Sequence, residues 1–156
     1  MWNNSVMSTL NKKNLTLIAL GMAYPDKLSP VQLQKTVFLF QQCLEEGGWT
    51  SIIDKFYQFQ PYDYGPFCQD IYEDTHDLSK QGLATIERSP NSQFLLYGAS
   101  ETGRSKSQQL ESHLMPPVKE YFNNLSAWVR HQTFSSLLSS IYEKYPSMAV
   151  NSIFRT

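Results

Sequence analysis

The strongest pattern in the chain is a run of apolar residues at helical spacing after Ser29-Pro30. Serine followed by proline is typical of a helix start, because serine caps the helix and proline fits its first turn. The apolar positions that follow fall on one helix face: Leu33, Val37, Phe40 and Leu44. Phe38 and Leu39 widen this face, so we expect a central buried helix that ends at Gly47-Gly48.

Other segments have the same periodicity and predict further helices. Asn14 is the expected cap of a first helix that ends before Pro25, and the first dozen residues, which lack periodicity, are expected to fray. A helix opened by Pro66 is expected to run to about Lys80, with Phe67 on its apolar face. The remaining helices are expected over about 102–114, 118–129 and 134–145, the last with Phe134 on its buried face and Pro146 as its stop.

Alternating aromatic residues predict a short strand over 56–60. The next six residues, 61–66, contain two prolines and a glycine, which predicts a turn. Residues 83–88 and 94–97 are expected to form a β-hairpin around a four-residue turn at 89–92.

The resulting order of helix, helix, strand, helix and hairpin is typical of a winged helix. We therefore expect a mainly α (α+β) protein with a winged-helix-like core and a β-hairpin wing. Residues 1–156 are expected to form a single domain, with the core over about 14–100 and appended helices over about 103–146. A fold of this kind does not determine a function.

Composition fits one globular domain, since 41% of the 156 residues are hydrophobic and 13% are aromatic. No apolar run approaches the length of a membrane span, so we expect a cytoplasmic protein that does not bind membranes. Cys43 and Cys68 lack the spacing of a zinc site or a disulfide framework, and we expect both to be small buried side chains in a reducing compartment.

Catalytic and metal-binding motifs are missing from the sequence. His76, His113 and His131 have no second histidine or cysteine three or four residues away, so no helical metal pair is formed. Neither a GxSxG nor an HExxH motif nor a Walker loop is present. We therefore expect no cofactor, no metal and no enzymatic activity.

Acidic residues concentrate in the middle of a chain whose net charge is −1. Four of them fall along one face of the helix expected before the wing: Asp70, Glu73, Asp74 and Asp77. In a DNA-binding winged helix this helix approaches phosphates and needs arginine or lysine, so the carboxylates argue against nucleic-acid binding. They form either an ordinary solvated face or a ridge that attracts a basic protein.

The turn before this helix contains several aromatic residues. Tyr62, Asp63 and Tyr64 precede Gly65, Pro66 and Phe67. The aromatic rings either cover the core or form a rigid protein-binding surface beside the carboxylates. In the second interpretation Tyr62, Asp63, Tyr64 and the four carboxylates together contact a partner.

Two motifs in order are similar to a known family. Residues 33–41 read LQKTVFLFQ, and residues 59–67 read FQPYDYGPF. This pair resembles the Panacea domain (the SocA-like antitoxin family) and the related YwgA-type bacterial proteins, although Gln32 stands where the family pattern has lysine. The resemblance covers about residues 29–100 and a helix ending at Tyr145-Pro146, with Gln34, Lys35, Gly65, Pro66 and Phe67 in the motifs.

The resemblance implies a non-enzymatic antitoxin that neutralises a toxin, often in phage-linked or defence loci. We therefore expect a protein-binding module whose partner is a toxin or a subunit of a defence complex. The alternative is a winged-helix DNA-binding transcriptional regulator.

Overall fold

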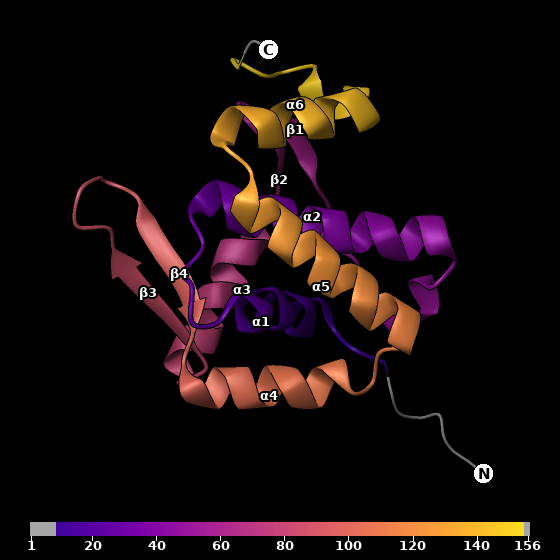
Figure 1. The fold of residues 1–156 in the computed structure, drawn as a ribbon, viewed down its shortest axis with the longest axis vertical. Coiled ribbons are helices and arrows are strands. Elements are labelled where there is room, and N and C mark those ends of the chain that lie inside the picture. Colours follow the sequence, from indigo (N-terminus) through magenta and orange to yellow (C-terminus); the bar gives the residue numbers. More distant parts are fainter. Residues whose placement is uncertain (1–8, 155–156) are drawn as a thin grey trace.

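The computed structural model describes residues 9–154, which fold into six α-helices and two short antiparallel β-hairpins (Figure 1). The helices are α1 (Lys12–Ala23), α2 (Pro30–Gly47), α3 (Gln69–Lys80), α4 (Glu101–Glu111), α5 (Pro116–His131) and α6 (Phe134–Lys144). The hairpins are β1 (Gln60–Tyr62) with β2 (Gly65–Phe67), and β3 (Ala84–Arg88) with β4 (Leu95–Ala99). Two 3-10 turns, η2 (Thr50–Ile52) and η3 (Pro146–Ala149), complete the described chain. The expected mainly helical α+β class is confirmed.

Helix α1 lies at the centre of the main core and packs against α2, α3, α4, α5 and β4. Its close approach to α4 requires a glycine, because a Cβ added to Gly21 would overlap the Ser107 side chain. Helix α2 crosses α5, where Phe40 and Phe122 stack with ring centroids 4.0 Å apart and are both fully buried. No helix within residues 9–154 is long and apolar enough to cross a membrane.

The first helix starts earlier than predicted. Asn11 is its cap, and Asn14, the predicted cap, instead occupies the third helical position and completes a capping box. Residues 1–8 of the segment expected to fray lie outside the described residues, but Leu10 is buried. Its N–H donates to the Ile52 carbonyl at 2.8 Å, and its own carbonyl accepts from Asp54 at 3.0 Å. These partners are some 40 residues away, so local periodicity could not reveal them.

The predicted turn at 61–66 is instead a β-hairpin. Pro61 lies opposite Pro66, so the two residues without an N–H share one position of the ladder. The predicted strand at 56–60 reduces to its last residue, which begins β1. Phe67 belongs to β2 rather than to the following helix, and that helix starts at Gln69 and not at Pro66.

The predicted second hairpin is confirmed as β3–β4, with Ile86 opposite Tyr97. Its turn is shifted by one residue, because Ser89 still donates to the Phe94 carbonyl at 2.9 Å. Leu28, just before α2, exchanges two backbone hydrogen bonds with Tyr97, at 2.7 and 2.9 Å. The segment between α1 and α2 therefore lies along the free edge of β4.

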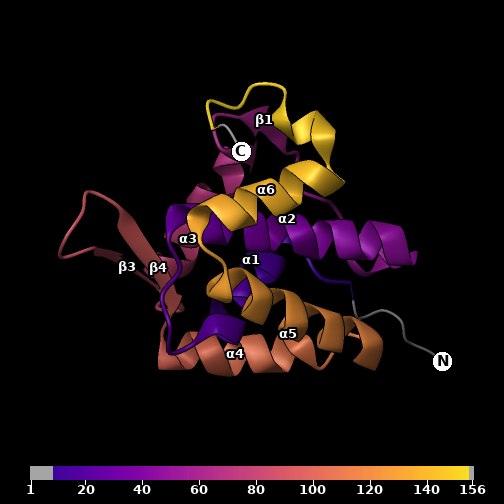
Figure 2. The same cartoon turned by 45° about the horizontal axis from the view of Figure 1, so that its top comes forward.

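A second, smaller group of elements lies on the side of α2 that faces away from α1. Figures 1 and 2 show α6, the β1–β2 hairpin and the C-terminal segment together at this end of the molecule. Phe38 of α2, Val129 of α5 and Leu137 and Ile141 of α6 form its apolar centre. Residues inserted between α2 and α3 and residues after α5 thus pack on one another.

Candidate functional site

Three polar side chains on α2 hold the β1–β2 hairpin and its flanking residues. We call Gln34, Lys35 and Gln41 the α2 polar clamp, and all three are buried. The Gln34 side-chain amide donates to the Cys68 carbonyl at 2.9 Å and accepts from the Cys68 N–H at 2.9 Å. These are the two bonds that a neighbouring β-strand would make, so the side chain of a helix replaces a strand.

Gln41 repeats the arrangement seven residues later on the same helix face. Its amide donates to the Tyr57 carbonyl at 3.1 Å and accepts from the Tyr57 N–H at 2.7 Å. The Tyr57 hydroxyl in turn donates to Asp74 at 2.7 Å and lies 2.7 Å from the Thr16 hydroxyl oxygen. Burial, together with the bond to Asp74, raises the pKa of Tyr57, which keeps this hydroxyl protonated.

Lys35, the residue after Gln34, lies in the interface between α2 and the hairpin. Lys35 is 3% exposed, and its ammonium group donates to the Pro66 carbonyl at 2.9 Å. Burial penalises the charged form and lowers the pKa of Lys35 to about 7. The two sequence motifs, some 30 residues apart, are therefore in direct contact through Lys35 and Pro66, and Gln34 bonds to Cys68, the residue that follows the second motif.

The turn of the hairpin is held from its other side by the C-terminal segment. The Asp63 carbonyl accepts from the Ile153 N–H at 3.0 Å and from the Ser152 hydroxyl at 3.1 Å. Asn151 donates to the Pro61 carbonyl at 3.1 Å. Gly65 has a φ of +89°, and a Cβ there would lie 3.2 Å from the Tyr142 ring, so glycine satisfies both the backbone and the space.

Large apolar side chains are exposed around this turn. We define the hairpin surface by five of them: Tyr62 (55% exposed), Tyr64 (42%), Phe134 (46%), Val150 (70%) and Ile153 (62%). The Tyr64 and Phe134 rings pack edge to face at 5.4 Å, and Phe134 packs in the same way on Phe154 at 5.7 Å. Tyr62 stacks on Phe67 at 5.0 Å, so each ring is fixed by a neighbour while one side stays open to solvent.

The four carboxylates of α3 are located elsewhere. Asp70 pairs with Lys12 at 3.2 Å and Asp77 pairs with Lys13 at 3.3 Å, while Asp74 accepts from Tyr57. Three of the four carboxylates therefore have partners on the start of α1 or at Tyr57, although the Asp70 and Asp77 side chains stay about half exposed, at 52% and 49%. Glu73 stays exposed.

The carboxylates are also separated from Tyr62 by the width of the helix. Tyr62 reaches α3 through Phe67, whose ring lies 5.8 Å from that of Tyr72. Tyr72 is two residues from Asp70, or roughly 200° around the helix axis. The structure thus brings Tyr62, Asp63 and Tyr64 together with the motif residues. It places Asp70, Asp74 and Asp77 on the opposite flank of α3, with Glu73 at the side of the helix between them and Tyr72.

Sequence reasoning missed Phe134, Val150 and Ile153. Phe134 was expected on a buried helix face, but it is the first residue of α6 and extends past the end of the apolar centre. Val150 and Ile153 follow the last helix and have no periodicity. In the sequence these two residues differ from their neighbours only in being apolar within a short polar segment, and this is too little to predict where they lie in the fold.

No group of three or more His, Cys, Asp or Glu side chains in the described residues could hold a metal ion. No protein-family model matches the chain, and no curated protein matches it. Membership of the Panacea or YwgA-type family therefore stays a prediction from the two motifs.

The burial of Lys35 predicts a pH-dependent stability. The folded state releases this proton near pH 7, whereas an unfolded lysine holds it to about pH 10.4. Between these values the unfolded state binds more protons, so the free energy of unfolding rises with pH, by on the order of 1 kcal/mol per pH unit. We expect Lys35→Met to abolish this rise in urea unfolding measured from pH 7 to pH 9.

The matched control is Lys119→Met, since Lys119 is exposed on α5. This variant should retain the wild-type dependence of stability on pH. If the curves of wild-type protein and Lys35→Met run parallel over the whole range, the Lys35 amine is not desolvated and the interpretation of the clamp is wrong.

Proposed function

We propose that this protein is a non-enzymatic protein-binding module that contacts its partner through the hairpin surface. One observation carries the proposal. Of the eight large apolar side chains that are exposed in the described residues, five gather around a single turn. Contiguous exposed apolar side chains are typical of protein-interaction sites, and aromatic residues dominate the binding energy of such sites.

The fixed geometry of the surface supports this function. The turn is held by the α2 polar clamp from one side and by residues 151–153 from the other. A surface that is already ordered loses little conformational entropy on association, which favours tight binding. Asp63 lies at the centre of the turn, and its exposed carboxylate gives the partner a polar contact beside the rings.

The core of the module is winged-helix-like. The order α1, α2, α3, β3, β4 and the pairing of Leu28 with Tyr97 support this description. In this view β3–β4 is the wing, and β1–β2 is an insertion before α3. The binding surface is then made by segments outside the core, the inserted hairpin and the C-terminal elements.

The partner is a protein of the kind that an antitoxin binds, either a toxin or a subunit of a defence complex. This part of the proposal is supported by the resemblance of the two motifs to the Panacea family. Glu73 is the one acidic residue of the α3 stripe without an intramolecular partner among the described residues, so it is the member best able to act as a charge at the rim.

Two phenylalanines provide a matched test of the surface. Phe134 lies in the hairpin surface, whereas Phe94 is 63% exposed in the wing. A tagged chain captured from its own host cells should retain a partner, identified by mass spectrometry. We expect Phe134→Ser to weaken binding to the purified partner by about tenfold or more, because aromatic anchors supply much of the binding energy of an interface.

Phe94→Ser is the control and should bind as the wild-type chain does. Thermal melts of both variants establish that each is folded. Equal affinity of Phe134→Ser and the wild-type chain, or equal loss in both variants, would contradict the proposed surface.

A second candidate function is binding of DNA, which the winged-helix-like order of elements favours. Helix α3 would then face the major groove, but it carries four carboxylates and, at its end, Lys80. Lys12 and Lys13 are paired with Asp70 and Asp77, so they leave no basic excess on this surface. Protein binding is therefore the first candidate.

We expect duplex DNA to bind no more tightly than the non-specific range, about 10⁻⁴–10⁻⁶ M at physiological salt. Fluorescence anisotropy of labelled duplexes at two salt concentrations measures this. Sequence-selective binding at nanomolar protein would establish the DNA-binding function and overturn the preference for a protein partner.

A further inference from the structure

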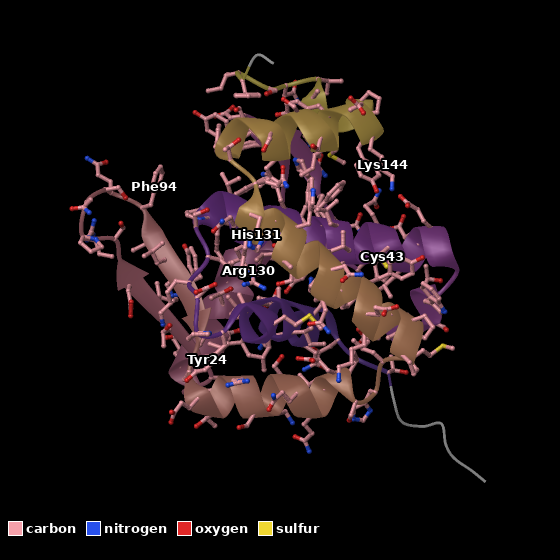
Figure 3. The ribbon with its side chains drawn as sticks, viewed as in Figure 1. Tyr24, Cys43, Phe94, Arg130, His131 and Lys144 are labelled. Atoms are coloured by element: carbon pink, nitrogen blue, oxygen red, sulfur yellow. The ribbon has the colours of Figure 1, made fainter. Side chains whose placement is uncertain are left out.

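A groove of about 580 Å³ lies between α2, α5 and α6, away from the hairpin surface. It is near the C-terminal end of α6, whereas Phe134 is at the N-terminal end of that helix. Figure 3 shows Cys43 of α2 and Lys144 of α6 on this side of the molecule. The volume is within the range of small-molecule sites, about 300–1,000 Å³.

Four aromatic residues line the groove. Trp49 follows α2, Tyr121 and Trp128 project from α5, and Tyr145 follows α6. The Trp49 and Tyr121 rings lie 6.3 Å apart, at 50° to each other. Rings at such angles offer faces and edges to a flat guest, which aromatic groups bind well by stacked and edge-to-face contacts.

The charged groups at the rim already satisfy each other. One oxygen of Glu46 accepts from Lys144 at 3.2 Å, and the other accepts from the Tyr145 hydroxyl at 2.7 Å. The ammonium of Lys144 also lies 5.5 Å from the centre of the Tyr145 ring. A charged guest would lose its hydration without gaining a free counter-charge, so the lining favours an uncharged one.

We propose that this groove binds a small, uncharged aromatic molecule of up to three rings. The inference concerns a second site and is independent of the proposed protein-binding function. The ligand lies against the two indole rings, with its edge toward the half-buried thiol of Cys43.

The test uses N-phenyl-1-naphthylamine, an uncharged fused-ring probe whose emission rises in apolar surroundings. Two of the three tryptophans, Trp49 and Trp128, line the groove, so bound probe should quench tryptophan emission as its own emission grows. We expect saturable binding of one probe per chain. Absence of saturation overturns the proposal.

Two serine-to-tryptophan variants locate the bound probe. Ser140 is exposed at the rim of the groove, whereas Ser105 is exposed on α4, outside the lining. We expect Ser140→Trp to fill the entrance and weaken binding by at least about tenfold, measured from probe emission, and Ser105→Trp to leave it unchanged. Equal affinities of the two variants overturn the proposed location.

A measurement on the wild-type chain does not depend on how the variants fold. The probe should slow alkylation of Cys43 by N-ethylmaleimide at least about tenfold at saturating probe. Alkylation of each cysteine is read from a peptide map. Cys68, which is buried and whose N–H donates to Gln34, is the internal control in the same map. Unchanged alkylation of Cys43 at saturating probe would place the probe elsewhere and overturn the proposal.

Discussion

Hydrogen bonds from the side chains of α2 to the backbone around β1 and β2 are the interaction on which the rest of the architecture depends. A hairpin of two three-residue strands is too short to be stable alone. Here Gln34 and Gln41 each make the pair of bonds that another strand would make, and Lys35 adds a third attachment at Pro66. Each bond also satisfies a backbone group that would otherwise be buried without a partner.

The position of the hairpin determines what the C-terminal elements can do. Residues 151–153 bond to the turn, and Tyr142 of α6 closes over Gly65. Phe134 is brought against Tyr64 by the same packing. The exposed apolar surface therefore combines two segments some 70 residues apart in sequence, which the fixed hairpin brings together. We regard the role of the α2 polar clamp as structural and that of the hairpin surface as functional.

The sequence predicted the elements that depend on local chemistry. The Ser29 cap, the glycine end of α2, the β3–β4 hairpin and the last two helices all follow from short-range patterns. The β1–β2 hairpin could not be predicted from such patterns, because Pro61 and Pro66 indicate a turn unless the partner strand is known.

The candidate site was only partly predictable for a similar reason. Tyr62 and Tyr64 were recognised from their residue types, and their exposure agrees with that interpretation. Gln34 and Gln41 resemble surface positions of a helix, and their burial depends on backbone groups far along the chain. The carboxylates of α3 formed a clear pattern, but that pattern could not show that Lys12, Lys13 and Tyr57 face them.

Amide hydrogen exchange tests the clamp most directly, because its two glutamines protect different N–H groups. In Gln34→Leu, exchange at the Cys68 amide should accelerate by roughly tenfold or more, while the Tyr57 amide, held by Gln41, stays protected. Gln41→Leu should give the reverse pattern. Unchanged protection of Cys68 in Gln34→Leu would contradict the account, because the hairpin would then be held by something other than the side chains of α2.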